Sequence, residues 1–439
     1  MKPLFRIVSI VFRTLQMMIW GAIGASVFAW RFIVESVHDR RFSRNATLRA
    51  AARALRLTLE GLGATFVKVG QIMSTRPDLL PPEIIAELIL LQENVRPFRF
   101  AEVRQIIEED LRRPLDELFD HFEPAPIASA SVAQVHRARL KGSGAALAIK
   151  VRRPSIARWA ELDRSIIQGL AHALELIPSM RLVAPVESAR QFCDAINRQL
   201  DFRREAANSN RFRANFADTP YVVFPRIYEN LSSERVLTME FVEGYRERDF
   251  GAVGIDPKKV AGLGMRVFCK MAFVDGFIHA DLHPGNIRFM RDNRIALFDL
   301  GLTAELTDED RVVFAQTMFY MANGMGRELA RQMYDLTEHR SAIDYSAYEK
   351  EVTEYLTRFV NQPLGEIEMS VAIGKFFDIY RRYGMRLDGR YTVLNVSMMV
   401  CEGLGKKLDP SLDITTEAKP FLEAALAPLM KSAAATTAN

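Results

Sequence analysis

Apolar positions recur every three or four residues over most of the chain, which is the spacing of amphipathic helices. This pattern covers residues 44–59, continues in a helix that begins at Pro81 and Pro82, and covers residues 101–111. It returns over residues 155–217 and again from Asp256 onward. The chain is therefore predicted to be mostly helical.

Alternating apolar and polar positions interrupt the helices in three places. Residues 118–151 alternate around the turn sequence "KGSG", which predicts a β-hairpin. Residues 221–242 predict two more strands, and residues 287–298 predict two short strands around "RDNR". A small antiparallel sheet placed between helical regions indicates the α+β class.

Length and composition indicate a folded protein with more than one structural unit. The chain has 439 residues, of which 49% are hydrophobic and 26% charged. One hydrophobic core stops growing well below this length. Cys193, Cys269 and Cys401 are far apart, which excludes a disulfide framework and a cysteine zinc site and favours a reducing compartment.

The N-terminal end is basic and apolar. Residues 1–60 contain ten Lys and Arg against three acids, and Thr14 to Trp30 is an uncharged run of 17 residues between Arg13 and Arg31. No arginine run interleaved with aromatic residues follows, so an anionic membrane surface is expected as a partner and nucleic acid is not. We interpret residues 1–35 as a membrane-associating segment; whether 14–30 spans, lies on the membrane or packs on the protein stays open.

The sequence "FIHADLHPGNIRF" contains the strongest chemical signal. His279, Asp281 and Asn286 fit the pattern H-x-D-x-x-x-x-N, in which the aspartate takes the proton of the nucleophile and the asparagine helps to hold Mg²⁺. Asp299, in "FDLG", follows 13 residues after Asn286, where a second metal ligand is expected. The predicted roles are catalytic for Asp281 and metal-binding for Asn286 and Asp299.

Upstream segments supply candidate partners for the phosphates of a nucleotide. Lys150 ends "ALAIK", which matches the V-A-I-K strand of kinases, and Glu205 in a predicted helix is its expected ion-pair partner and a catalytic residue with it. The loop before this strand is rich in alanine, so the cover over the nucleotide is expected to be stiff. The predicted nucleotide-binding residues are Ala128, Ser129, Ala130, Ser131, Val132, Ala133 and Lys150, with Glu240 and Val242 at the hinge.

Two other chemistries deserve comparison with this one. His279, Asp281 and His283 could coordinate zinc from an extended segment, but no acid-rich or cysteine cluster accompanies them. A Ser-His-Asp hydrolase is disfavoured because the sequence contains no G-x-S-x-G.

These motifs together resemble those of the UbiB (AarF/ABC) family of atypical kinases, over roughly residues 60–305. The most specific element is "KVGQ", Lys68 to Gln71, which fits the family's K-x-G-Q. The segments "PIASASVAQVH", "DFRREAAN" and "HADLHPGN" are similar to the family's other motifs.

The resemblance implies a protein-kinase-like bilobal fold, with a small antiparallel-sheet N-lobe, a helical C-lobe and a helical N-terminal extension that carries K-x-G-Q over the active site. ATP and Mg²⁺ are the implied cofactors, and Lys68, Gln71 and Asp201 the implied residues of the gating extension. The expected domains are 36–115 for the extension, 116–242 for the N-lobe, 243–430 for the C-lobe and 431–439 for a disordered tail.

The sequence departs from the family pattern at three points. The family's E-x-D reads Gln199-Leu200-Asp201, so an amide replaces a carboxylate. Ala133 stands where the family commonly has glycine. The segment "PFLEAALAPLMKSAAATTAN" cannot span a membrane, unlike the two helices with which many bacterial members end.

The resemblance implies an atypical kinase or ATPase that supports ubiquinone or other isoprenoid lipid biosynthesis, cytoplasmic and associated with the inner membrane surface. The implied partners are a membrane lipid or an isoprenoid quinone precursor, with a biosynthetic enzyme complex and a homodimer left open. The alternatives are a small-molecule kinase of the aminoglycoside or choline type and a non-catalytic scaffold that binds nucleotide and lipid.

Overall fold

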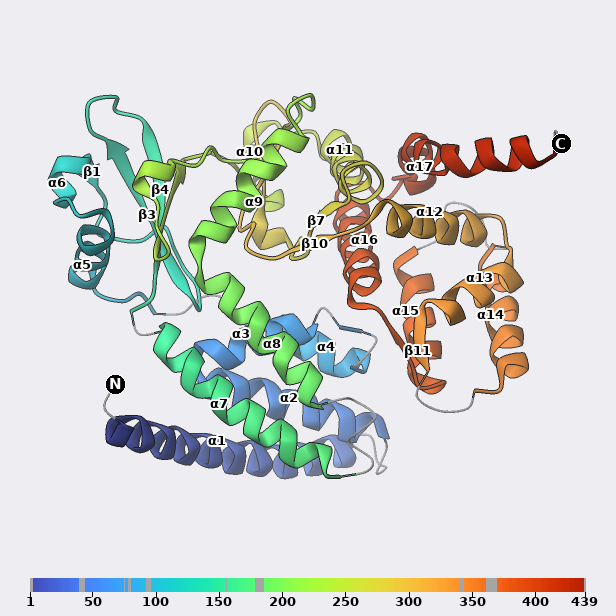
Figure 1. Cartoon of the computed structure of the whole chain (residues 1–439), viewed down its shortest axis with the longest axis horizontal. Helices are drawn as coiled ribbons and strands as arrows, with labels where there is room; N and C mark the ends of the chain where they lie inside the picture. The colour runs from blue at the N-terminus through green and yellow to red at the C-terminus, as the bar shows by residue number, and fades with distance from the viewer. Residues whose placement is uncertain are drawn as a thin grey trace. The chain divides into compact units, whose positions relative to one another are not determined.

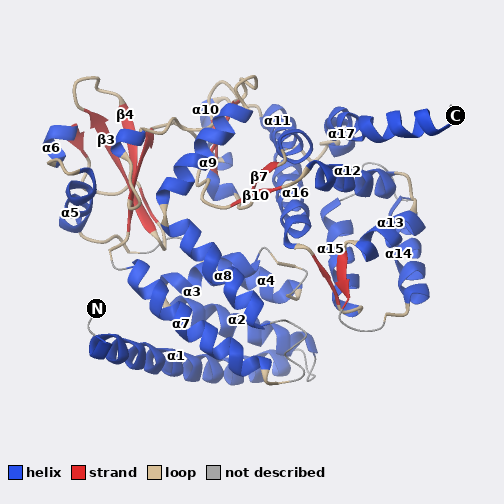
Figure 2. Ribbon diagram, viewed as in Figure 1, coloured by secondary structure: helices blue, strands red, loops and turns tan. Residues whose placement is uncertain are grey.

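The computed structural model describes residues 3–437 except 39–43, 75, 78–79, 92–95, 155, 178–184, 340–342 and 361–368. Contacts divide the chain into two compact units, both mainly helical (Figures 1 and 2). The first unit comprises Met1–Ala207 and Arg226–Phe241, and the second comprises Asn208–Pro225 and Val242–Asn439.

The first unit contains the predicted antiparallel sheet. Its strands follow the order β1-β3-β4-β6, with β2 pairing to β3, and the "KGSG" turn joins β3 to β4 as predicted. The apolar faces of these strands pack against helix α5, which places Ile149 and Val151 in a core with Ile107. The strands are β1 (Phe119–Phe122), β2 (Ala128–Ser129), β3 (Ala133–Leu140), β4 (Ala146–Arg152) and β6 (Val236–Glu240).

Helices make up the rest of the first unit, and the predicted helical segments are confirmed. Helix α4 begins directly after Pro81, where a fixed φ suits the first turn. The helices are α1 (Pro3–His38), α2 (Arg44–Leu62), α3 (Ala64–Ser74), α4 (Pro82–Ile89), α5 (Phe100–Leu111), α6 (Leu115–Leu118), α7 (Ile156–Glu175), α8 (Pro185–Leu200), α9 (Phe202–Asn215), which continues into the second unit, and the 3₁₀ turn η2 (Glu229–Leu231).

Helix α1 packs along α2 and α7 (Figure 1), and a buried ion pair fixes it there. The guanidinium of Arg13 donates to both carboxylate oxygens of Asp163 in α7, at 2.6 and 3.0 Å, and to the carbonyl of Leu62 at 2.8 Å. Arg13 is 6% exposed and Asp163 is fully buried. Phe66 and Trp159 lie against the guanidinium as cation–π partners.

Helices also dominate the second unit, as the sequence predicts from residue 256 onward. They are α10 (Phe250–Val253), α11 (Pro257–Cys269), α12 (Asp308–Ala322), α13 (Gly326–Asp335), α14 (Tyr345–Val360), α15 (Met369–Arg382), α16 (Gly389–Leu408) and α17 (Ile414–Thr437). Shorter turns are η3 (Glu247–Asp249), the π-helical η4 (Lys270–Asp275) and η5 (Pro284–Asn286). A continuous core of aromatic, leucine and methionine side chains joins these elements.

Three small strand groups in the second unit hold its loops. Strand β7 (Phe277–His279) pairs with β10 (Thr303–Glu305), and β11 (Thr337–His339) pairs with β12 (Met385–Leu387). The predicted hairpin around "RDNR" is present as β8 (Ile287–Phe289) and β9 (Ile295–Leu297).

Both strands expected in residues 221–242 are present, as β5 (Val222–Val223) and β6, and β5 pairs in parallel with β9. One prediction requires correction. Helix α17 runs to Thr437, so the segment expected to be a disordered tail from residue 431 is helical up to that point; alanine, its main component, has the highest helix propensity. Residues 438–439 lie outside the described residues.

The Arg13–Asp163 pair generates a prediction for stability. Replacing Asp163 with Asn leaves a buried guanidinium without its carboxylate, which costs about 3–5 kcal/mol in comparable pairs. The double variant Arg13→Met/Asp163→Leu removes both charges and should recover most of the loss. The midpoint of urea unfolding measures both effects.

The matched control is Arg190→Gln in α8, where the exposed pair with Glu187 spans 2.9 Å. Exposed pairs contribute about 0–1 kcal/mol, so this variant should unfold close to the wild type. A loss in Asp163→Asn no larger than in Arg190→Gln would contradict the role assigned to the buried pair.

Candidate functional site

Lys150 and Glu205 form the predicted ion pair within the first unit. Lys150 lies in the middle of β4, opposite Val135 of β3 and Leu237 of β6, and its Nζ is 2.9 Å from each carboxylate oxygen of Glu205 in α9. Both residues are buried, and Nζ also lies 5.3 Å from the ring centroid of Phe202. The amine is therefore held at a fixed point in an apolar sheet.

The alanine-rich segment is held by an arginine that the sequence analysis did not single out. Arg153 Nε donates to the carbonyl of Ala130 at 2.9 Å, and its Nη2 donates to the hydroxyl of Ser129 at 2.9 Å. The turn from Ala128 to Ala133 needs no positive φ, which explains why alanine can replace glycine in it. The signal for Arg153 was the second arginine of "KVRRP", directly after the Lys150 strand.

The "KVGQ" segment lies in the middle of α3, and its glycine is required by packing. A Cβ on Gly70 would lie 2.2 Å from Leu91 Cδ1 and 2.9 Å from Leu59 Cδ1, so the close contact of α3 with these leucines excludes a side chain. Lys68 is 7% exposed and forms no ion pair or hydrogen bond with any residue that the structure describes.

Two amides of the first unit carry unsatisfied buried oxygens. Oε1 of Gln71 and Oε1 of Gln199 have no hydrogen-bond partner among the described residues, although Nε2 of Gln71 lies 3.4 Å from the Leu91 carbonyl. Asp201, in contrast, is fully engaged. Arg203 binds both of its carboxylate oxygens at 2.9 Å and lowers the pKa of Asp201, so this aspartate is held at the start of α9.

The predicted hinge residues differ in what their backbones offer. The N–H of Glu240 donates to the carbonyl of Arg226 at 2.8 Å and is not available to a purine. Val242 makes no hydrogen bond with the part of the chain that the structure describes. The Glu240 N–H is therefore a poor candidate for adenine binding, and Val242 is the better one.

In the second unit, His279 joins the two loops that carry the predicted catalytic and metal residues. Its Nδ1 accepts the backbone N–H of Asp281 at 3.1 Å, so the proton is on Nε2, which donates to the carbonyl of Phe298 at 3.0 Å. Burial lowers the pKa of His279 and keeps the imidazole neutral. Both ring nitrogens are thus occupied, and a zinc ion could bind His279 only by displacing one of these partners.

Asn286 completes the link between the loops. Its Nδ2 donates to the carbonyl of Asp281 at 3.0 Å, and its own carbonyl accepts the N–H of Phe298 at 2.9 Å. Its side-chain oxygen, Oδ1, makes no hydrogen bond with any residue that the structure describes. The loops that carry Asp281 and Asp299 are 18 residues apart in the sequence. They lie close together because the antiparallel β8–β9 hairpin between them reverses the direction of the chain.

Asp299 occupies a strained backbone position at the end of this network. Its φ is +51°, a left-handed conformation that non-glycine residues adopt rarely and that clusters at functional sites. The next residue, Leu300, is fixed through its carbonyl by Asn208 Nδ2 at 2.8 Å. The strain is thereby compensated by contacts on both sides of Asp299.

The residues present fit a magnesium ion better than a zinc ion. Asn286 and Asp299 offer an amide oxygen and a carboxylate, which are ligands that Mg²⁺ accepts together with water and phosphate oxygens. Among the described residues there is no group of three His, Cys, Asp or Glu side chains placed to hold a metal. Asn286 and Asp299 would supply two of the ligands of Mg²⁺, and the phosphate oxygens of a nucleotide and water would supply the others.

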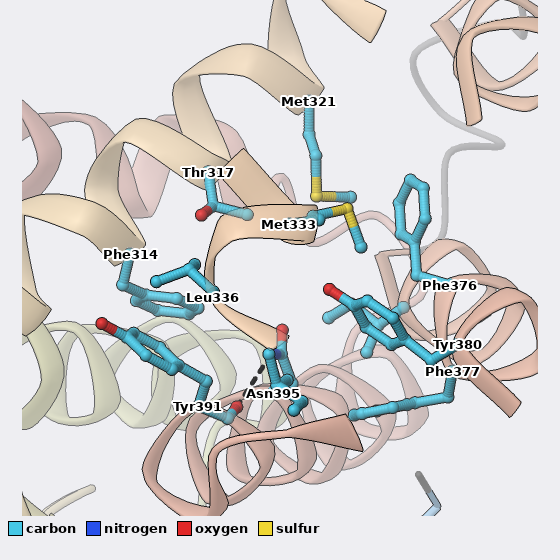
Figure 3. Close-up of a pocket in the computed structure, with 12 residues that line it drawn as sticks. Phe314, Thr317, Met321, Met333, Leu336, Phe376, Phe377, Tyr380, Tyr391 and Asn395 are labelled. Atoms are coloured by element: carbon cyan, nitrogen blue, oxygen red, sulfur yellow. Dashed lines mark hydrogen bonds between the residues drawn. The ribbon is translucent and has the colours of Figure 1, made fainter. Parts of the chain in front are cut away.

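A separate cavity lies in the helical part of the second unit, between α12, α13, α15 and α16 (Figure 3). Mostly aromatic, aliphatic and methionine side chains line it, and the polar groups in its lining belong to Thr317, Tyr380, Tyr391 and Asn395. Its volume of about 30 Å³ is that of one or two water molecules, so it is a packing defect of the core and not a substrate site.

Comparison with known proteins identifies these elements as parts of known domains. Residues 90–333 match the ABC1 atypical kinase-like domain, and residues 352–413 match the UbiB helical domain. The first match contains the Lys150–Glu205 pair and the Asp281 and Asp299 loops. The "KVGQ" segment lies before it.

Curated relatives are similar over most of the chain. A probable protein kinase UbiB of Shewanella piezotolerans is 34% identical over 383 residues, which cover 85% of this chain and 70% of the relative. The corresponding protein of Erwinia tasmaniensis is 35% identical over 84% of this chain and 69% of its own. That of Aeromonas hydrophila is 34% identical over 96% of this chain and 78% of its own.

A solved structure supports the fold. The complex of Rv3197 with erythromycin from Mycobacterium tuberculosis matches with a TM-score of 0.57 at 20% identity, covering 80% of this chain and 90% of that one. The predicted kinase-like fold is confirmed. By sequence and by fold, the chain belongs to the UbiB family and carries its atypical kinase-like domain.

Proposed function

We propose that this protein binds Mg-ATP and acts as an atypical kinase or ATPase. The observation that carries the proposal is the buried, bidentate pair of Lys150 with Glu205, at 2.9 Å to both oxygens. A buried charge pair is a weak source of stability, so a functional use is the better reason for its presence. The expected use of the amine is to bind the phosphates of the nucleotide.

The residues of the second unit supply the chemistry. The oxygen of the attacking hydroxyl or water bonds to the γ-phosphorus, and the carboxylate of Asp281 takes the proton that this oxygen loses. The bond from that phosphorus to the β,γ-bridging oxygen breaks, and ADP leaves with the electron pair. His279 positions Asp281 by accepting its backbone N–H and thus acts through it.

Asn286 and Asp299 are the residues that would hold magnesium. When bound, the ion neutralises charge on the phosphate oxygens. Asn286 presents its oxygen because its amide nitrogen is committed to the Asp281 carbonyl. Asp299 follows strand β9 by two residues, and its left-handed backbone ends the extended conformation there.

Membrane association is part of the proposal and rests on α1. Residues Val8–Val34 are long and apolar enough to cross a membrane by length and composition, which is weak evidence by itself. Large apolar side chains are exposed along the helix: Val8, Val11, Phe12, Leu15, Met18, Ile19, Ile23, Trp30, Ile33 and Val34. Because Arg13 is fixed to the protein body, we propose that α1 lies on the membrane surface.

The biological setting follows from the family. The names of the relatives point to ubiquinone biosynthesis, and we propose that this protein supports ubiquinone or other isoprenoid lipid synthesis at the inner membrane surface. A lipid or quinone precursor is the proposed partner.

The first prediction tests catalysis. Asp281→Asn and Asp299→Asn should each lower Mg²⁺-dependent phosphate release about 10²-fold or more, because a proton acceptor or a metal ligand is lost. Asparagine tolerates a left-handed backbone, so Asp299→Asn should keep its loop. Phosphate release and nucleotide affinity are measured side by side.

The control is Asp292→Asn on the exposed β8–β9 turn, which should behave as the wild type. Equal phosphate release in wild type and Asp299→Asn, with nucleotide still bound by both, would favour a non-catalytic scaffold over an enzyme.

The second prediction concerns Lys68, a largely buried side chain that forms no ion pair or hydrogen bond among the described residues. Lys68→Met should keep the free energy of unfolding within about 1 kcal/mol of the wild type, because the change breaks no ion pair or hydrogen bond among these residues. The same change should weaken Mg-ATP binding about tenfold if the amine serves phosphate.

Urea unfolding and nucleotide titration measure the two effects, with Lys141→Met on the exposed β3–β4 turn as the control. A variant that is less stable and binds Mg-ATP normally would show that Lys68 has a structural role instead.

The third prediction tests the membrane surface. Ile19→Asp/Ile23→Asp places two charges on the exposed face of α1 and should reduce sedimentation with anionic vesicles at least tenfold. Phe319→Asp/Val371→Asp alters two exposed apolar residues of the second unit and should bind vesicles normally. Equal vesicle binding by the two double variants would exclude α1 as the contact.

A further inference from the structure

A polar cavity of about 200 Å³ lies beside the catalytic loop in the second unit. One wall is the loop itself, at Pro284 and Gly285, between the predicted catalytic residue Asp281 and the predicted metal ligand Asn286. Another wall carries the side chains of Arg246 and Arg248. Neither arginine has a role in the function proposed above.

A backbone bridge holds this basic segment against the loop. Tyr245 and Phe289 exchange two hydrogen bonds, at 2.8 and 2.9 Å, in antiparallel register. This bridge brings the segment that carries Arg246 alongside the segment that carries Arg288. The approach requires a glycine at 244, because a Cβ there would lie 2.5 Å from the Cβ of Arg288.

The third arginine is committed to the loop. Nη1 of Arg288 donates to the carbonyl of Gly285 at 2.9 Å and to that of Ile287 at 2.7 Å. Burial, followed by repulsion from Arg246 and Arg248, lowers the pKa of Arg288. The positive charges of Arg246 and Arg248 therefore repel that of Arg288.

The acids nearby do not neutralise these positive charges. Arg246 forms no ion pair with any residue in the described ranges, and Arg248 has only Asp249, at 3.8 Å. Glu247 is already bound by Lys407 of α16. Among the residues that line the cavity, Arg246 and Arg248 carry two positive charges against the single negative charge of Glu247, so the lining has a net charge of +1.

We propose that this cavity binds a phosphate group carried by the acceptor or by a lipid head group. Guanidinium groups pair with phosphate oxygens through two parallel hydrogen bonds, so Arg246 and Arg248 suit a doubly charged ligand better than a neutral one. The space exceeds several water volumes and has room for such a group.

The position of the cavity suggests what a bound phosphate would do. A ligand whose phosphate lies against Pro284 and Gly285 is anchored within five residues of Asp281, on the loop that carries this base. The acceptor class would then be a hydroxyl compound that already bears a phosphate. This identification of the ligand as acceptor rests on the proposed function, whereas the binding of the anion does not.

The test uses the full chain and glycerol 3-phosphate, a small phosphomonoester that does not mimic a nucleotide triphosphate. Its binding is measured by calorimetry with a non-hydrolysable ATP analogue and Mg²⁺ present. Arg246→Gln/Arg248→Gln should weaken binding about tenfold, equivalent to about 1.4 kcal/mol. Arg294→Gln/Arg331→Gln removes the same charge from exposed sites of the same unit and should leave binding unchanged.

A parallel arm replaces glycerol 3-phosphate with phosphatidylcholine vesicles that contain phosphatidic acid. Loss of glycerol 3-phosphate binding in the Arg246/Arg248 variant identifies a soluble phosphate compound as the source. Loss of vesicle binding alone identifies a lipid head group. Equal binding by that variant and the control in both arms, or no binding by the wild type in either, overturns the proposal.

Affinity for the ATP analogue is measured separately in every variant and should not change. If the wild type fails to bind the analogue, the proposed kinase or ATPase function fails, while glycerol 3-phosphate binding without nucleotide still decides whether the arginine cavity is an anion site.

Discussion

A fully buried, neutral imidazole holds together the chemistry of the second unit. His279 accepts a backbone N–H from the Asp281 loop and donates to the carbonyl next to Asp299. Each of these backbone groups would be unsatisfied and buried without it, at a cost of about 1–3 kcal/mol each. The histidine in the H-x-D pattern is thus a positioning residue: it fixes where the carboxylates are and leaves the proton transfer to Asp281.

The polar groups that are left unsatisfied are as informative as those that are paired. Most buried polar atoms in native proteins have partners, yet Gln71 and Gln199 in the first unit keep buried oxygens without one among the described residues. The remaining contacts of α3, such as the close approach at Gly70, are tightly packed. Helix α3 is therefore well packed, yet it contains a buried polar oxygen whose missing hydrogen bond lowers stability. This combination is typical of sites maintained for function.

The sequence predicted the elements whose signal is local. Lys150 could be placed because "ALAIK" matches the V-A-I-K strand of kinases, and Glu205 because it lies in a predicted helix as the expected ion-pair partner. Asp281, Asn286 and Asp299 were identified by spacing. The structure joins Asn286 to Asp281 by a hydrogen bond, and His279 to the carbonyl of Phe298, the residue before Asp299.

Features that depend on tertiary contacts could not be predicted in the same way. The left-handed backbone of Asp299 has no local cause in "FDLG", and Arg153 gains its role only when the alanine-rich turn folds back beside it. The two-residue strand β5 pairs with β9, more than 70 residues later, and so offers no pattern of its own. The basic cavity at Arg246 likewise depends on a bridge between Tyr245 and Phe289 that joins distant segments.

The two partners of the Arg13–Asp163 ion pair are synthesised at different times. The two residues are 150 positions apart. At a synthesis rate of about 5–20 residues per second, α1 leaves the ribosome roughly 8–30 s before its carboxylate partner exists. During that interval a long apolar helix that contains Arg6, Arg13 and Arg31 has only lipid, chaperones or α2 to cover it. If α1 meets the membrane as proposed, Arg13 favours packing against the completed α7 over burial in lipid, because a charge is expensive to bury in lipid.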